Sequence, residues 1–349
     1  MHKHVHVMTE NPLNAETTIE SLRPWATANS EFFCRNQSQV LTEPIPISSW
    51  RLEISGEVAK TLSLSYEEIL RMPKVTVANA IECSGNGRAL LRKAARGNPW
   101  TTGGVGNAVW GGVWLKDILM AAGLTEKAFH VAFHGIPDPT GRTKAGFIRS
   151  IPMEKALSST LLAYEMNGET LPPEHGYPLR SIPLGWTGAN CVKWLERIAV
   201  IEEPHHGHFM DSVYRIYQEG QQSTDGAPVT AIPLKSFITS PSSGDQVAGD
   251  SITLTGVAYG GESDVDSVSV SVDGGASWQS AEFVGPRERW AWKQWRYTWR
   301  PPHAGEYTLM SRATGTDGTV QPMRAAWNVL GYGNNGVEEH ATVIRVNEK

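Results

Sequence analysis

The sequence pattern changes near Pro233, and this change constrains the fold more than any other feature. Before it, short alternating stretches such as residues 50–56 are interspersed with helical ones, for example a helix capped by Ser65 with Glu68 three residues later. After it, short alternating stretches and turns continue to the C-terminus, as expected for β-strands. At 349 residues the chain exceeds the size at which single hydrophobic cores stop growing. We therefore predict an α+β domain followed by an immunoglobulin-like β-sandwich.

The boundaries follow from the same pattern. We expect a flexible tail over residues 1–17, the α+β domain over 18–205, a connector over 206–232 and the sandwich over 233–349. Scattered glycines and few apolar repeats favour the connector. Within the sandwich, a bulge near residues 293–294 would place five rings on one face: Trp290, Trp292, Trp295, Tyr297 and Trp299.

Composition excludes several classes of function. The formal charge of −5, without a lysine and arginine run, argues against a nucleic-acid or membrane-surface partner. Cys34, Cys83 and Cys191 are too far apart for a Cys-x-x-Cys metal site, and no c-type haem motif occurs. No stretch has the length of a transmembrane helix or a signal peptide. We expect a soluble chain, cytoplasmic as written or periplasmic if its start is a processed end.

Cys83 lies in the most informative stretch, residues 80–88. A thiol in a turn of glycine and asparagine, with Arg88 five residues on, is placed to ionise, because positive charge and loop amides stabilise a thiolate. The sulfur could attack a substrate or bind a soft metal. A nucleophile would require a histidine base, for which His134 and His175 are the candidates.

Other cationic residues suggest an anion site. Arg35 and Arg88 could together hold a small oxyanion, because the guanidinium fork matches its oxygens. His175 and Arg180 lie in a stiff proline- and glycine-rich segment, and Lys193 follows a loop of small residues. Each segment alone is more often a structural loop. The glycines match neither the dinucleotide fingerprint nor a Walker motif.

Taken together, these segments resemble the sulfite oxidase family of molybdenum enzymes from about residue 17 to 346. Six markers occur in order: Phe-Phe-x-Arg-Asn at 32–36, Cys-x-Gly-Asn-x-Arg at 83–88, a tryptophan at 100, Leu-Ala-Tyr-Glu-Met-Asn-Gly at 162–168, His-Gly-Tyr-Pro-x-Arg at 175–180, and Val-Lys-Trp-Leu at 192–195.

The resemblance implies a molybdopterin-binding catalytic domain followed by a dimerisation domain, and therefore a homodimer. Cys83 would be the thiolate ligand of molybdenum. The remaining cofactor contacts would come from Phe33, Arg35, Asn36, His175, Arg180, Cys191, Val192 and Lys193, and the substrate pocket from Arg35, Arg88, Trp100 and Tyr164. The implied reaction oxidises sulfite to sulfate by oxo transfer at molybdenum. Electrons would pass to a separate acceptor, a cytochrome or oxygen, because the chain has no haem motif.

Two positions depart from the animal and plant pattern. Gln37 replaces the histidine of Arg-Asn-His, and Leu330 replaces a substrate-binding arginine. The second change reduces the positive charge available to a dianion, so a nitrate-type oxyanion reductase with the same cofactor is the alternative. A cofactor-free binding or scaffold protein is a further alternative, although such a protein has no use for Cys83, His175, Arg180 and Lys193.

Overall fold

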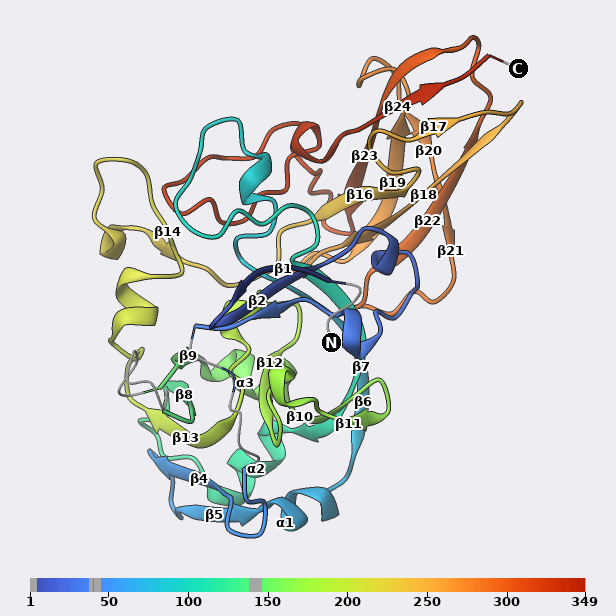
Figure 1. Ribbon diagram of the computed structural model, residues 1–349. Helices are drawn as coiled ribbons and strands as arrows, with labels where there is room; N and C mark the ends of the chain where they lie inside the picture. The colour runs from blue at the N-terminus through green and yellow to red at the C-terminus, as the bar shows by residue number, and fades with distance from the viewer. Residues whose placement is uncertain (1–4, 38–39, 41–44, 138–145, 349) are drawn as a thin grey trace.

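The computed structural model describes residues 5–37, 40, 45–137 and 146–348. The β-sandwich lies at one end of the molecule and a sheet with short helices at the other (Figure 1). The two parts differ in pattern as the sequence predicts: short α-helices occur only before Pro233 within the described ranges, and the second part is built from strands. No helix among the described residues is long and apolar enough to cross a membrane.

Two five-stranded sheets form the core of the first domain. One contains, in spatial order, β11 (Glu169–Thr170), β10 (Thr160–Met166), β7 (Val105–Trp114) and β6 (Val75–Glu82), with β12 (Arg180–Pro183) also pairing with β10. The other contains β5 (Leu62–Ser65), β4 (Arg51–Gly56), β13 (Leu195–Ile201), β8 (His130–Gly135) and β9 (Ile148–Pro152). Apolar side chains of both sheets pack into two clusters, and the second cluster includes Cys83.

Three short helices accompany these sheets: α1 (Tyr66–Arg71), α2 (Leu115–Ala122) and α3 (Met153–Ser159). The predicted capping box before α1 is confirmed, because the Ser65 side chain accepts from the Glu68 amide while the Glu68 carboxylate accepts from the Ser65 amide. Short 3-10 turns occur at Glu20–Leu22, Asn29–Glu31, Arg88–Leu90, Pro173–His175, Gly188–Asn190, Ser223–Asp225 and Glu338–His340.

The N-terminal segment is a strand hairpin, which corrects the expectation of a flexible tail. β1 (Val5–Glu10) pairs with β2 (Leu13–Thr17), and β2 pairs with β3 (Cys34–Arg35). β2 is almost fully buried because it lies against the first domain, where the Thr17 amide donates to the Gly103 carbonyl at 2.9 Å. Residues 1–4 lie outside the described part. The hairpin brings Asn14 beside Arg35 and thereby supports the strand that carries this arginine.

The second domain is a sandwich of two sheets. One contains β16 (Lys235–Ser240), β18 (Ile252–Tyr259), β22 (Lys293–Trp299) and β21 (Glu282–Val284); the other contains β17 (Gln246–Val247), β24 (Thr342–Val346), β23 (Gly305–Gly315), β19 (Val265–Ser271) and β20 (Gln279–Ser280). The predicted bulge near residues 293–294 is wrong, because β22 pairs with β18 without a register shift there. Trp290 and Trp292 precede the strand, and Trp292 packs between the domains instead.

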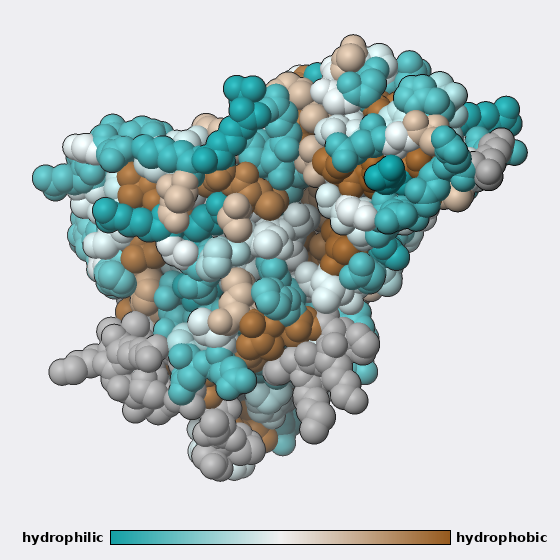
Figure 2. Space-filling view, turned by 45° about the horizontal axis from the view of Figure 1, so that its top comes forward, coloured by the Kyte–Doolittle hydropathy of each residue, from teal (hydrophilic) through white to brown (hydrophobic). Residues whose placement is uncertain are grey.

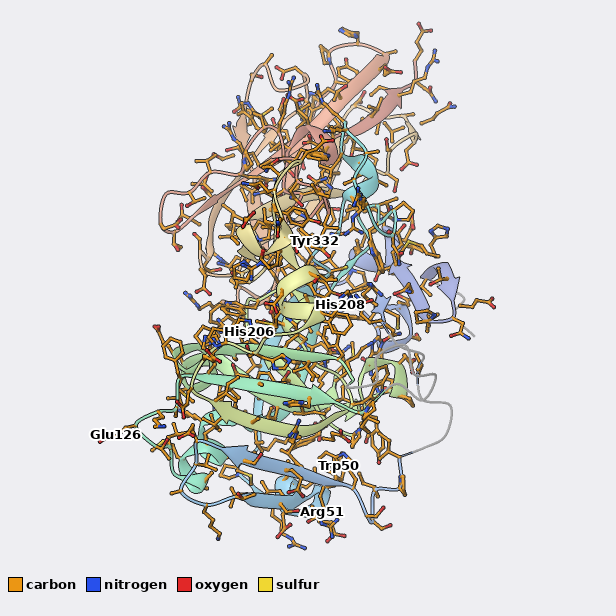
Figure 3. The ribbon with its side chains drawn as sticks, turned by 90° about the vertical axis from the view of Figure 1, so that its left-hand side faces the viewer. Trp50, Arg51, Glu126, His206, His208 and Tyr332 are labelled. Atoms are coloured by element: carbon orange, nitrogen blue, oxygen red, sulfur yellow. The ribbon has the colours of Figure 1, made fainter. Side chains whose placement is uncertain are left out.

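The connector is an irregular segment that returns to the first domain. It contains a π-helical turn (His208–Ser212) and the strand pair β14 (Arg215–Ile216) with β15 (Ala227–Pro228). Figure 3 shows this turn between the first domain and Tyr332, with His208 at its start. His206 precedes the turn, and its side chain is exposed. Phe209 of the same turn is buried in a ring cluster, and this contact places the connector beside the site.

Candidate active site

A cavity opens where the Cys83 turn, β3 and the connector meet. It has about 750 Å³ of atom-free space, part of it open to solvent. Its lining residues come from segments that are distant in sequence: Phe32, Phe33, Arg35, Asn36, Gln37, Ile81, Cys83, Ser84, Phe147, His175, Arg180, Gly188, Ala189, Cys191, Lys193, Trp194 and Tyr214. The face of the molecule drawn in Figure 2 is mostly hydrophilic, with several hydrophobic patches.

Cys83 is held rigidly at the end of β6. Its amide donates to the Gly104 carbonyl at 2.8 Å, and its carbonyl accepts from the Asn86 amide at 2.9 Å. A Cβ at Gly85 would lie 2.3 Å from the Arg88 guanidinium, which folds back over the turn, so a larger residue there would displace this side chain. The thiol consequently points into the cavity while the chain reverses around it.

The electrostatic environment of the thiol contains opposing effects. Burial raises the pKa of Cys83, whereas Arg35, the Gly85 amide and Arg88 act in the opposite direction. A buried thiol with a raised pKa is a poor nucleophile by itself, but metal binding displaces the thiol proton. His134 does not line the cavity and is instead bonded to Arg197. His175 does line it, and its Nε2 lies 3.1 Å from the Asn29 carbonyl.

Cationic side chains surround the cavity, and no carboxylate occurs among its described lining residues. Arg35 Nη1 donates to Asn14 Oδ1 at 3.0 Å, and Arg180 Nη1 donates to the His175 carbonyl at 2.9 Å. Lys193 Nζ donates to Asn36 Oδ1 and to the Glu174 carbonyl. Burial lowers the pKa of Lys193 to about 7, and Arg180 and Arg35 act in the same direction. Cations held only by neutral acceptors indicate an anion site.

The structure places most of the candidate cofactor-binding residues at this cavity, but Tyr164 is elsewhere. Side chains alternate along β10, so Leu161 and Ala163 join the cluster that contains Cys83, whereas Leu162 and Tyr164 face the other cluster. The Tyr164 ring lies 6.4 Å from the Tyr66 ring, and burial raises its pKa. Tyr164 therefore does not reach the cavity, which corrects its expected place in the substrate pocket.

Three other candidates are also absent from the lining. Trp100 is buried edge-on against Phe33, with ring centroids 6.2 Å apart. Arg88 donates to the carbonyls of Leu330, at 2.8 Å, and Asn98, at 2.7 Å, so its guanidinium ties the turn to two loops. Val192 lies between Cys191 and Lys193, which both line the cavity, but its side chain packs in the same apolar cluster as Tyr164 and therefore faces away. None of these three side chains lines the cavity.

Tyr214 was missed by the sequence analysis, although its ring lines the cavity. Gln37 Nε2 donates to its hydroxyl at 2.7 Å, so the amide that replaces the expected histidine has a partner. Both Tyr214 and Trp194, another lining residue, have positive φ, at 59° and 51°. Backbone strain of this kind is concentrated at functional sites. A lone tyrosine in a connector has no sequence signal that would have identified it.

The residues present fit a molybdopterin cofactor. No group of three or more histidine, cysteine, aspartate or glutamate side chains in the described ranges could hold a metal, so a metal at Cys83 would need ligands from a bound organic group. Dithiolene sulfurs supply such ligands and match a soft thiolate. No described residue accepts from the buried Nε of Arg180, a lining residue, so a phosphate in the cavity could accept from this donor.

Comparisons with known proteins agree with this fit. Residues 40–209 match the oxidoreductase molybdopterin binding domain, and residues 227–343 match the Mo-co oxidoreductase dimerisation domain. The two matches define a molybdopterin-dependent oxidoreductase, with the cofactor-binding domain preceding the dimerisation domain.

The relatives identify the family. The chain is 36% identical to the sulfite oxidase of Gallus gallus, over 95% of this chain and 76% of the relative. It is 35% identical to the mitochondrial sulfite oxidase of Mus musculus, over 96% of this chain, and spans 64% of that relative. The crystal structure of the sulfane dehydrogenase SoxCD from Paracoccus pantotrophus is similar with a TM-score of 0.83 and 28% identity, over 98% of this chain and 88% of that chain. The chain belongs to the sulfite oxidase family, and its cofactor is molybdenum-molybdopterin.

Proposed function

We propose that the protein oxidises sulfite to sulfate and passes the electrons to a separate acceptor. The observation that carries this proposal is the cavity in which the Cys83 thiol faces a wall of cations without a described carboxylate. The curated sulfite oxidases with 35–36% identity support the substrate. The matched dimerisation domain supports a homodimer, and a cytochrome or oxygen is the proposed acceptor.

The chain supplies binding and orientation, while molybdenum supplies the two-electron redox chemistry. Cys83 would be the protein ligand of the metal. His175, Arg180 and Lys193 would bind the pterin and its phosphate, together with Asn36, Phe33 and the loop at Cys191 and Val192. Arg35 faces both the thiol and the cavity, so it would bind an oxygen of the substrate. The Tyr214 hydroxyl would donate to a substrate oxygen while Gln37 fixes its direction.

The decisive experiment compares wild type with Cys83→Ser and Cys34→Ser, each expressed with intact cofactor biosynthesis. Molybdenum content is measured together with sulfite-dependent reduction of an artificial acceptor. Cys34 is also buried but does not line the cavity, so its variant is the matched control. We expect Cys83→Ser to remain folded and lose turnover, and Cys34→Ser to keep it. Full turnover by molybdenum-loaded Cys83→Ser would refute the ligand assignment.

Oxidation of sulfane sulfur is the second candidate. The structural similarity to the sulfane dehydrogenase favours it, as do the rings of Phe32, Phe33 and Phe147 in the lining, which suit a less charged sulfur compound. A molybdenum-loaded enzyme that does not oxidise sulfite but oxidises a polysulfide would establish this candidate. Nitrate-dependent oxidation of a reduced artificial electron donor by the molybdenum-loaded enzyme would establish the oxyanion-reductase alternative.

A further inference from the structure

Arg149 is a buried cation beside the cavity, and no described residue forms an ion pair with it. It lies on β9 with 1% of its surface exposed. Its Nη2 donates to Asn190 Oδ1 at 2.9 Å, its Nη1 donates to the Phe209 carbonyl, and its Nε has no hydrogen-bond acceptor. None of the ion pairs among the described residues includes it. Burial of an uncompensated charge is strongly unfavourable.

The charge is present at neutral pH. Burial lowers the pKa of Arg149 to about 10, which still leaves the guanidinium protonated. A neutral side chain of similar length would fill the same space at a smaller desolvation cost. The structure therefore retains a positive charge that contributes no ion pair to stability within the described chain, and this charge requires a counterpart.

The position of Arg149 indicates where that counterpart lies. Its ζ-carbon is 5.4 Å from the centroid of the Tyr214 ring, which lines the cavity. Tyr214 stacks on Tyr332, with centroids 5.7 Å apart, and Figure 3 shows Tyr332 between the two domains. Leu330 packs against the same ring cluster and adds no charge. Arg149 is thus separated from the cavity contents by a single aromatic layer.

We propose that Arg149 is a positioning residue that sets anion selectivity: an oxyanion bound in the cavity balances its charge through the Tyr214 ring. This inference rests on the proposed function only for the identity of the anion as a sulfur oxyanion. Because this interaction acts at a distance, its strength depends on the total charge of the anion. It therefore favours a dianion over a monoanion more strongly than a hydrogen bond to a single oxygen would. It also acts through low-dielectric protein, so salt screens it little.

The test measures dissociation constants of sulfate and nitrate for the holoenzyme by calorimetry, in wild type and three variants. Arg149→Met removes the charge, Arg149→Lys keeps it, and Arg149→Gln removes the charge but retains an amide donor. A unit charge about 10 Å from the ligand, at an effective dielectric of about 20, alters binding of a monoanion roughly tenfold and of a dianion roughly a hundredfold. We expect these losses in both neutral variants, with near wild-type binding in Arg149→Lys.

Lys155→Met is the matched control, because Lys155 is also buried but pairs with Glu262 away from the cavity. Equal losses for sulfate and nitrate, a similar loss in Lys155→Met, or unchanged binding in a folded neutral variant would overturn the proposal. If Arg149→Met does not fold, Arg149→Gln decides the question. Charge-dependent sulfate binding by an enzyme that does not oxidise sulfite would contradict the proposed function and leave the role of Arg149 established.

Discussion

Replacement of Lys235 should measure how much the domain interface contributes to the stability of the protein, because it removes an ion pair between the domains and leaves both hydrophobic cores unchanged. Lys235 of β16 and Glu82 of β6 form an ion pair with 1% and 3% of their side chains exposed. The same Glu82 oxygen also accepts from the Tyr259 hydroxyl at 3.0 Å and from Asn86 Nδ2 at 2.9 Å. Lys235→Met leaves that carboxylate buried with two neutral donors. Removal of one partner from a buried pair costs about 3–5 kcal/mol.

The double variant Glu82→Gln with Lys235→Met should recover most of this loss. The amide oxygen of the glutamine can still accept from Tyr259 and Asn86, and no charge remains to be buried. Its cost relative to wild type should be about 1 kcal/mol, the value of one ordinary hydrogen bond. Each single variant should therefore be less stable than the double variant.

Thermal unfolding of the four proteins measures this coupling. At about 2–4 °C for each kcal/mol, Lys235→Met should lower the Tm by roughly 10 °C. The surface pair Arg71 and Glu67 offers a control cycle, since exposed pairs of this kind contribute less than about 1 kcal/mol. Additive effects of the two buried substitutions would refute the reasoning, because the carboxylate and ammonium would then be stabilised independently.

Three further outcomes can be checked. Tyr214→Phe should lower kcat/KM for sulfite by roughly 10- to 100-fold, the worth of one hydrogen bond to a charged oxygen, and unchanged kinetics would remove the hydroxyl from the site. Arg88→Met loses the hydrogen bonds to Leu330 and Asn98 and should lower the free energy of unfolding, measured with urea, by about 3 kcal/mol. An unchanged urea midpoint would contradict the role of Arg88 in holding the two loops against the turn. Burial, together with Arg197, lowers the pKa of His134 to about 4. Between about pH 6.5 and 4, His134 is therefore protonated in the unfolded chain but neutral in the folded chain, and the free energy of unfolding falls as the pH falls. His134→Gln should remove up to roughly 2 kcal/mol of this loss between pH 7 and 4.5, whereas exposed His206→Gln should not.

The sequence predicted those parts of the molecule that local pattern determines. The capping box at Ser65, the change to an all-β pattern after Pro233 and the presentation of Cys83 in a tight turn all depend on neighbouring residues. The hairpin over residues 5–17 was not predicted, because its burial comes from a distant surface and its own side chains are mixed in character.

The errors at the site have a shared cause. Tyr164 was assigned to the pocket from its motif, but strand parity turns it to the opposite face. Tyr214 and Arg149 reach the cavity region only because the connector folds back on β9, a long-range contact without a local signal. Residue type therefore predicted the chemistry of the site, and the topology determined which side chains reach it.

The turn that carries Cys83 is completed by a segment that lies far later in the chain. The Gly333 amide donates to the Ser84 carbonyl at 2.9 Å, and Asn334 Nδ2 donates to the Gly87 carbonyl at 2.7 Å. Asn334 lies 247 residues after Gly87, so a nascent chain lacks these donors until long after the turn itself has been synthesised. A first domain that folds before this segment is synthesised would lack these two hydrogen bonds to the Cys83 turn. Insertion of the cofactor is therefore expected to follow translation of both domains. A variant truncated before residue 328 should be purified as apoprotein, without molybdenum.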